Sequence, residues 1–577
     1  MLRGFGRFVG YVILSIFILE RGTVRAADPD FGPNVYIFDP TQPAAQEKIH
    51  AVFKLQERAQ FGLGRYALLF KPGKYELDVP VGFFTHVAGL GALPDDVIIH
   101  GGVWTDAGWM GHNATCNFWR IAENLAIKPT KSSGNTWAVS QAAPIRRLHV
   151  IGDLNLAAGG WSSGGFMADC RIDGHVRAQS QQQWFSRNSQ WQHWDGGAWN
   201  IAFAGCQNPP DGTWPERPFT TIAKTHHLRE KPFLAIIDGQ WKVMVPPLRL
   251  EETSGVSWDA RSPTPVAVPI ESFHIARADR DTAVTINAAL SQGKHLLITP
   301  GVYHLDDSIA ITRPGTIVLG LGLPSLVPMT GQPALRIDRS EGTIVSGLMI
   351  DASPAIVDNL VVIGIAGQAR GDAANPATLH DLYCRVGGNG PGKAKCMVTI
   401  HDHHVIGDNL WLWRADHGKN VGWTENVCAN GLIVNGDDVT MYGLFVEHTQ
   451  AYQTIWNGNG GRVYFYQSEL PYDPPSAEAW HSAAGAGYAS YKVNNHVTTH
   501  QAWALGVYHV IKSAPVMVEN GIETPAAPGI KLSHMLTYRL SGGKPGSGIT
   551  HVINGIAGES VTKDRTIVLE FPQATSP

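Results

Sequence analysis

The chain has 577 residues, more than one ordinary hydrophobic core contains, which predicts two large domains. Charged residues make up only 16% and the formal net charge is -4, so neither nucleic acid nor an anionic membrane is an expected partner. The chain also holds 63 glycines and 18 tryptophans. Many glycines indicate many turns, and tryptophan rings can offer flat surfaces for sugars, although most tryptophans lie in a core.

Residues 1–26 have the pattern of a signal peptide. Arg3 and Arg7 precede a mostly apolar run at 8–19, and a sequence with small residues ends at Ala26, where a signal peptidase would cleave. The apolar run is too short to cross a bilayer comfortably. We therefore expect a secreted or periplasmic protein that has no stable membrane association once the signal is removed.

The same supersecondary unit opens each half of the chain. Residues 65–75 read RYALLFKPGKY and are followed by VAGLGALP at 87–94. Residues 294–303 read KHLLITPGVY and are followed by VLGLGLP at 318–324. Each unit contains an apolar strand, a Pro-Gly turn, a tyrosine and a Gly-Leu-Gly turn, and each follows a segment able to form a short helix. This internal repeat predicts two homologous domains.

A Pro-rich stretch at 262–269 separates the halves and is typical of a linker, which gives domains at 27–262 and 263–577. In both halves, short β-type runs recur about every 20 to 30 residues, with Gly, Asn and Asp between them. Strands at this period predict a solenoid of stacked coils, so the expected fold is all-β with two tandem parallel β-helices. A β-propeller is the main alternative, but it usually has a recurring blade signature, which we do not find.

The densest polar and aromatic region is 443–475, GLFVEHTQAYQTIWNGNGGRVYFYQSELPYDPP. Its carboxylates Glu447 and Glu469 are separated by close to one coil of a β-helix, so they can lie in adjacent coils, about 5 Å apart along the stack. Each carboxylate then disfavours the charge on the other, and one keeps its proton to higher pH. Such a group suits general acid catalysis. The alternative is that either glutamate is a solvated turn residue.

Aromatic and amide side chains around this pair are candidate substrate contacts. Trp456, beside an Asn-Gly-Asn turn, is the best candidate for a ring platform under a sugar. We also expect contacts from Tyr466, Tyr472 and Gln453. Some of these rings must instead belong to the core, because successive strand residues point to opposite faces.

Asp416 and His417 follow the strand-like segment NLWLWR and could bind sugar hydroxyl groups. Asp416 could also act as a distant base, and its alternative role is that of a turn aspartate bonded to its own backbone. His401 and His403 would share a strand face, but no third ligand accompanies them, so surface histidines are the better interpretation. We expect no metal and no cofactor.

The 443–475 segment resembles the corresponding segment of glycoside hydrolase family 55. The paired opening units resemble the same family and other pectate-lyase-like β-helix proteins. The resemblance extends over nearly all of the mature chain. It implies tandem right-handed parallel β-helices and a glycoside hydrolase that acts on β-1,3-glucan and inverts the anomeric centre.

The resemblance also implies roles for individual residues. Glu469 matches the general acid of the family, and Glu447 matches a second essential glutamate one coil earlier. The attacking water would be held by the first β-helix, where WAVSQAAP supplies Gln141 and SSGGFMAD supplies Ser163. The segment SQQQWFSRN supplies Gln183 as a further substrate contact. The site would then lie between the two domains.

Two other functions stay open. A polysaccharide lyase on the same fold needs a cation or Lys and Arg side chains to neutralise a uronate, whereas 443–475 is rich in carboxylates and poor in such groups. A non-catalytic glycan-binding solenoid predicts that Glu447 and Glu469 do not share a cleft. Hydrolysis predicts that both line one cleft with aromatic walls. In each case the expected partner is a polysaccharide or oligosaccharide, bound by a monomer.

Overall fold

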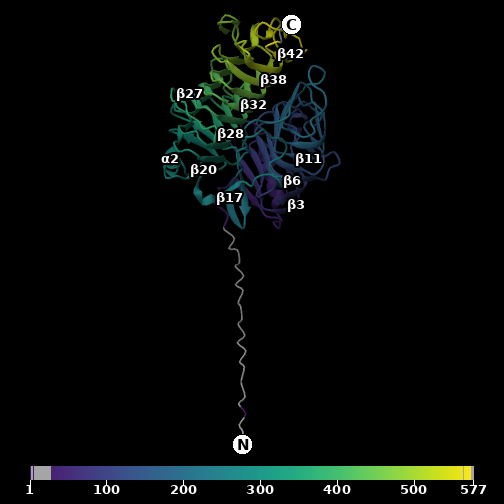
Figure 1. Ribbon diagram of the computed structural model, residues 1–577, viewed down its shortest axis with the longest axis vertical. Coiled ribbons are helices and arrows are strands. Elements are labelled where there is room, and N and C mark those ends of the chain that lie inside the picture. Colours follow the sequence, from purple (N-terminus) through teal and green to yellow (C-terminus); the bar gives the residue numbers. More distant parts are fainter. Residues whose placement is uncertain (2–3, 5–26, 563, 574–577) are drawn as a thin grey trace.

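A computed structural model describes residues 1, 4, 27–562 and 564–573. Two stacks of parallel strands lie side by side, the first in purple and blue and the second running from teal to yellow (Figure 1). The predicted all-β fold with two parallel β-helices is confirmed. The predicted signal peptide lies outside the described residues except at positions 1 and 4. Within the described part of the chain, no helix has the length and apolar character needed to span a membrane.

The first β-helix is a stack of short parallel strands. Alternate side chains point into one hydrophobic core, where Leu68 of one coil is paired with Val87 of the next. A helix, α1 (Ala45–Gln56), buries its apolar face on this core. The central strands are β1 (Val35–Phe38), β2 (Tyr66–Phe70), β4 (Thr85–Gly89), β6 (Arg120–Pro129), β8 (Ile145–Val150), β10 (Gly165–Ala168), β12 (Gln183–Arg187), β14 (Asn200–Ala204) and β15 (Phe219–Ile222), and the flanking strands are β3 (Gly73–Pro80), β5 (Val97–Trp104), β7 (Asn135–Thr136), β9 (Leu154–Asn155), β11 (Arg171–Gln179) and β13 (Gln190–Gly196).

Between the β-helices the chain forms a small antiparallel sheet that the sequence pattern did not predict. It consists of β16 (Phe233–Ile237), β17 (Gln240–Val245) and β18 (Val266–Pro269). The expected boundary at 262/263 falls just before β18, so the second half of the Pro-rich stretch is a strand and not a free linker. Proline is tolerated here because β18 is an edge strand.

The second β-helix begins at β19 (Phe273–Ala276) and is longer than the first (Figure 1). Its two sheets, which are parallel except for the last strand pair of one of them, enclose one continuous hydrophobic core. A helix, α2 (Ala283–Ser291), packs near its start. One sheet continues through β20 (His295–Ile298), β23 (Ile317–Gly320), β26 (Ile344–Asp351), β28 (Ala377–Val386), β30 (Val405–Arg414), β32 (Thr440–Glu447), β34 (Gly461–Glu469), β38 (Thr499–His509), β40 (Gly529–Arg539) and β42 (Thr566–Phe571), and the other contains β22 (Ile309–Ile311), β25 (Leu335–Ile337), β27 (Val357–Ile363), β29 (Ala394–Ile400), β31 (Cys428–Val434), β33 (Thr454–Trp456), β37 (Tyr491–Val493), β39 (Met517–Glu523) and β41 (Gly548–Ile553).

Strand register aligns four side chains in one column near the ends of β30, β32, β34 and β38. Trp413 pairs with Glu447, Glu447 with Glu469, and Glu469 with Tyr508. Adjacent parallel strands lie about 4.8 Å apart, so the two glutamates project side by side from neighbouring coils. The one-coil spacing predicted for this pair is confirmed.

Each of these strands bends once before it reaches the column. The bend lies at Asn409 in β30, at Gly443 in β32, at Phe465 in β34 and at Ala504 in β38, where φ is 67°, 70°, 73° and 57°. Left-handed backbone is uncommon for residues other than glycine, and here it interrupts the alternation of side chains. In β34, Val463 and Tyr466 point into the core, whereas Phe465 points to the first β-helix.

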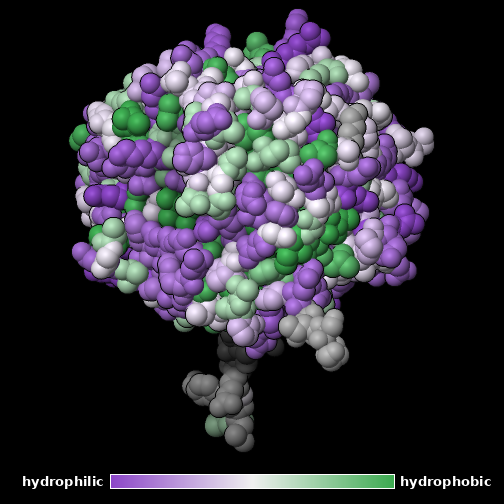
Figure 2. Space-filling view, turned by 90° about the horizontal axis from the view of Figure 1, so that it is seen from above, coloured by the Kyte–Doolittle hydropathy of each residue, from purple (hydrophilic) through white to green (hydrophobic). Residues whose placement is uncertain are grey.

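Aromatic side chains fill the contact between the two β-helices. Phe118 of the first packs on Trp411 of the second with ring centroids 4.7 Å apart. Trp119 packs on Trp413 at 5.8 Å. The surface seen from above is mostly hydrophilic, with small scattered hydrophobic patches (Figure 2). The aromatic side chains at the contact are buried in one hydrophobic cluster that joins the two halves.

Ion pairs lie within the same contact. Arg146 Nη2 lies 2.7 Å from Asp381 Oδ1, and Arg146 Nη1 lies 2.8 Å from Asp408 Oδ2. Arg187 Nη2 lies 2.6 Å from Asp408 Oδ2, and its Nη1 lies 2.7 Å from Glu230 Oε1. All these side chains are buried. Because an unpaired buried charge is costly, the network favours one relative placement of the two β-helices.

Candidate active site

A cavity of about 260 Å³ opens between the two β-helices at the glutamate column. Both β-helices contribute walls, and the predicted residues in its lining are Gln141, Ser163, Asp416, His417, Glu447, Glu469 and Tyr472. The two glutamates therefore share one cleft with aromatic walls, as the hydrolase hypothesis predicts. The complete lining is Thr115, Cys116, Phe118, Gln141, Ser163, Gln182, Trp199, Trp413, Asp416, His417, Glu447, His448, Glu469, Tyr472 and Leu540.

Glu447 is held by three N–H donors. Gln141 Nε2 and Gln467 Nε2 donate to Oε1 at 2.8 and 3.0 Å. Trp411 Nε1 donates to Oε2 at 2.9 Å. Gln141 belongs to the first β-helix, so both halves of the chain position this carboxyl group.

Gly164 provides the space for these two amides. Its φ is +92°, and a Cβ at this position would lie 2.6 Å from Gln467 Oε1 and 2.9 Å from Gln141 Cδ. A larger residue would therefore be strained and would displace the donors of Glu447. Glycine is required at this close approach of the β-helices.

Glu469 has a more open environment than Glu447. Its side chain is 16% exposed, whereas Glu447 as a residue is 3% exposed. Tyr472 donates its hydroxyl hydrogen bond to Glu469 Oε2, and His448 Nε2 lies 4.0 Å from the same oxygen. Glu469 is thus the carboxyl group of the pair that a bound ligand can reach.

The pair holds a proton more firmly than isolated carboxyl groups do. Burial raises the pKa of Glu447 well above its ordinary value, and the neighbouring charge of Glu469 raises it further. Burial also raises the pKa of Glu469, against the opposing effects of His448 and of the hydrogen bond from Tyr472. The pair can therefore retain a proton for delivery to a leaving oxygen.

Asp416 and His417 form an ion pair in the wall. His417 Nδ1 lies 2.9 Å from Asp416 Oδ1, and Gln60 Nε2 lies 2.5 Å from His417 Nε2. Burial favours the neutral acid, but the hydrogen bond from His417 brings the pKa of Asp416 to about 2. Burial also disfavours the imidazolium, but the bond to Asp416 raises the pKa of His417 to about 10. So acidic a carboxyl group is a weak proton acceptor, which argues against the distant-base alternative.

Three predicted substrate contacts are wrong. Trp456 ends β33 instead of lying in the turn, and its fully buried ring packs 4.8 Å from that of His500. Tyr466 points into the core of the second β-helix, with its hydroxyl 2.9 Å from Ser490 Oγ. Gln453 is also buried. Strand alternation turns Trp456 and Tyr466 inward, away from the cavity. Gln453 precedes β33 and is held by donating from Nε2 to Ser468 Oγ at 2.8 Å.

The prediction that Gln183 contacts the substrate is also wrong, although Gln183 lies next to the site. It is fully buried and does not line the cavity, but its Oε1 accepts a 2.7 Å hydrogen bond from Ser163 Oγ. It therefore orients a lining residue instead of contacting the ligand directly.

Sequence reasoning missed several lining residues. Trp413 could have been found, because it lies in the strand-like segment NLWLWR, three residues before the predicted contact Asp416. In the structure it pairs in register with Glu447. His448 directly follows Glu447 and also lines the cavity. Trp199 carries no comparable local signal, since only the packing of the β-helices brings it to the site.

Comparison with known proteins agrees with this geometry. The LAM55 pectate lyase-like domain matches residues 273–469. An exo-β-1,3-glucanase from Streptomyces sp. (strain SirexAA-E / ActE) is 46% identical over 550 residues, which cover 94% of this chain and 90% of the relative. The chain belongs to the LAM55 family. It is a glycoside hydrolase, and the resemblance to glycoside hydrolase family 55 is confirmed.

Solved structures of this LAM55 family share the fold. The structure of sacteLam55A from Streptomyces sp. SirexAA-E is 45% identical, with a TM-score of 0.91 over 94% of this chain and 99% of that one. A glutamate-to-alanine variant of sacteLam55A in complex with glucose is 44% identical, with a TM-score of 0.92 over the same shares. Both β-helices of the LAM55 hydrolase therefore have counterparts in a solved relative.

Proposed function

We propose that this protein is a secreted, inverting exo-β-1,3-glucanase with Glu469 as its general acid. The observation that carries the proposal is the shared cleft, in which paired glutamates from adjacent coils face first-helix side chains and aromatic walls. The similar Streptomyces enzyme is named an exo-β-1,3-glucanase, and glucose is bound in the solved variant of sacteLam55A. These relatives support glucan as the substrate class and cleavage from a chain end.

Hydrogen bonding favours Glu469 over Glu447 as the proton donor. Burial raises the pKa of Glu447, but its oxygens accept three N–H groups, which oppose that effect and favour the carboxylate form. Glu469 is bonded to a hydroxyl group and lies nearer to the open cavity. Its proton can therefore pass to the glycosidic oxygen as the bond to the leaving sugar breaks.

The attacking water is assigned to the region between Glu447 and the first β-helix. Ser163 Oγ donates to Gln183 Oε1, so its lone pairs stay free to accept a hydrogen bond from the attacking water. Gln141 links the same wall to Glu447. Water attacks from this side, opposite the departing oxygen that Glu469 protonates, and passes its proton to the Glu447 carboxylate. This is a single displacement, and it inverts the anomeric centre.

Tyr472→Phe tests whether the Tyr472 hydroxyl group lowers the pKa of Glu469. The hydroxyl hydrogen bond lowers the pKa of Glu469, so its loss should raise that pKa. A general acid is active only while protonated, so the alkaline limb of kcat/KM should move up by about one pH unit. The pH dependence of oligosaccharide hydrolysis measures this shift. Tyr452→Phe, outside the cavity, is the control, and an unchanged or lowered limb in Tyr472→Phe would contradict the assignment.

The product distinguishes the proposed function from its alternatives. Incubation with laminarin should release glucose, and NMR in the first minutes should show the α-anomer, because a β-linkage is inverted. Early β-anomer would refute inversion. An unsaturated product that absorbs in the near ultraviolet, formed from a uronic glycan, would indicate the lyase. Among the described residues, the cavity lining includes no Lys or Arg to neutralise a uronate, which favours the hydrolase.

A further inference from the structure

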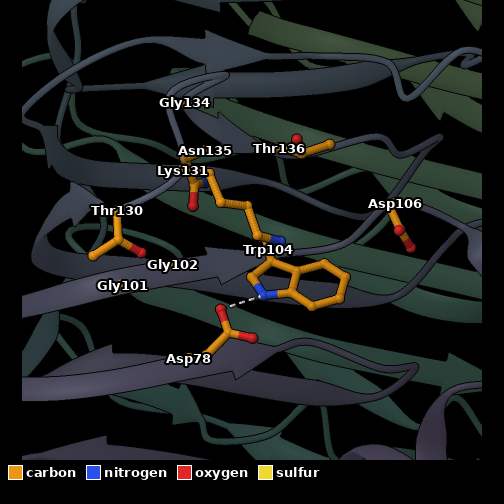
Figure 3. Close-up of a pocket in the computed structure, with 10 residues that line it drawn as sticks. All are labelled: Asp78, Gly101, Gly102, Trp104, Asp106, Thr130, Lys131, Gly134, Asn135 and Thr136. Carbon is orange, nitrogen blue, oxygen red and sulfur yellow. Dashed lines mark hydrogen bonds between the residues drawn. The ribbon is translucent and has the colours of Figure 1, made fainter.

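A second hollow lies at the surface of the first β-helix, with a lining entirely different from that of the active-site cavity (Figure 3). Its volume is about 70 Å³. Neighbouring coils supply Asp78 from β3, Trp104 from β5 and Thr136 from β7. Strands β3 and β5 pair in parallel through this region, so the stacked coils hold the side chains in fixed order.

The ring of Trp104 is held in place at the centre of this hollow. Its Nε1 donates a 2.7 Å hydrogen bond to Asp78 Oδ1, which Figure 3 shows as a dashed line. Gly102 leaves space for the ring, since a Cβ there would lie 3.0 Å from Trp104 Cδ1. Asn135 braces the strand by accepting from Val103 N at 3.1 Å and donating to Val103 O at 2.8 Å. An oriented ring can bind a ligand with little further ordering cost.

Polar groups surround this ring. Lys131 Nζ lies 4.7 Å from the ring centroid of Trp104, and Asp106 and Thr130 lie to either side in Figure 3. The lysine is exposed and flexible, so it can move aside while its ammonium group remains as a donor. An indole face beside carboxylate, hydroxyl and ammonium groups suits a neutral pyranose, which has an apolar face and a rim of hydroxyl groups.

We propose that this hollow binds a glucose unit of a β-1,3-glucan chain and holds the enzyme on its polymer. The choice of glucan rests on the proposed function. A one-ring site is weak by itself, but tethering raises the effective concentration of glucan at the active site. The Trp104 site therefore contributes to retention on polymeric glucan and not to the cleavage of short oligosaccharides.

The test separates binding from catalysis in the full-length protein. Retention on an insoluble β-1,3-glucan is compared for the unchanged enzyme, Trp104→Ala and Thr136→Arg, whose long side chain would cover the ring. Lys395→Ala, an exposed substitution on the second β-helix, is the control. Both hollow variants should lose retention about five-fold or more, while laminaritriose hydrolysis stays within about two-fold. Circular dichroism checks folding, and Thr136→Arg preserves the test if Trp104→Ala misfolds.

The outcomes distinguish this inference from the proposed function. Retention that is independent of Trp104 and Thr136, with laminaritriose still hydrolysed, would overturn the second site alone. Equal loss of retention on insoluble cellulose would overturn the assignment to β-1,3-glucan. Failure of the unchanged enzyme to hydrolyse β-1,3-glucan would overturn the proposed function itself.

Discussion

Glu469→Gln should lower kcat on laminarin about 10²–10⁴-fold, the contribution expected from a positioned general acid. Glutamine has nearly the same shape and can still accept the hydrogen bond from Tyr472, so the fold and glucan binding should persist. Its amide has no acidic proton to transfer to the leaving oxygen. Initial rates at saturating laminarin, together with binding of laminarioligosaccharide by calorimetry, measure the two effects separately.

A substrate with an activated leaving group identifies the step that is lost. Dinitrophenolate departs without protonation, so Glu469→Gln should keep most of the activity of the unchanged enzyme on a dinitrophenyl β-glucoside. Glu447→Gln is the matched variant, with the same substitution one coil away. It should lose activity on both substrates, because Glu447 is assigned to the side of the attacking water. Equal deficits on both substrates in Glu469→Gln would refute its role as the acid.

Arg146→Met should lower the free energy of unfolding by about 3–5 kcal/mol, the cost of removing one charged partner from two buried carboxylates, which keep Arg187 and Lys231 as their cations. The guanidinium of Arg146 pairs with Asp381 at 2.7 Å and with Asp408 at 2.8 Å, and both carboxylates are fully buried. Methionine keeps most of the apolar stem but none of the donors. Urea unfolding followed by tryptophan fluorescence and circular dichroism measures the loss.

Arg171→Met provides the control on the same β-helix. Arg171 Nε pairs with Asp173 Oδ1 at 2.9 Å, but both side chains are partly exposed, so we expect a change of about 0–1 kcal/mol. A similar loss in both variants would show that the interface network has no special role. Because Gln141 reaches Glu447 across the same interface, Arg146→Met should also lose activity at lower urea than its secondary structure.

The sequence by itself determined the repeating architecture and the chemical pair. Short strands at the period of one coil bury their apolar faces only by stacking, so the repeat was sufficient to predict two β-helices. The same period placed Glu447 opposite Glu469, because parallel in-register strands keep the spacing of their coils. These features depend on the local sequence pattern and on regular strand pairing, and both can be inferred from the spacing of residues along the chain.

Only the tertiary structure decided which other side chains reach that pair. Strand alternation turned Trp456 of β33 and Tyr466 of β34 into the core. In β34, the left-handed backbone at Phe465 also changed which side chains point inward. Gln141 meets Glu447 only because buried rings and ion pairs dock one β-helix on the other. Contacts between distant segments depend on how whole surfaces pack, and no local spacing in the chain encodes that arrangement.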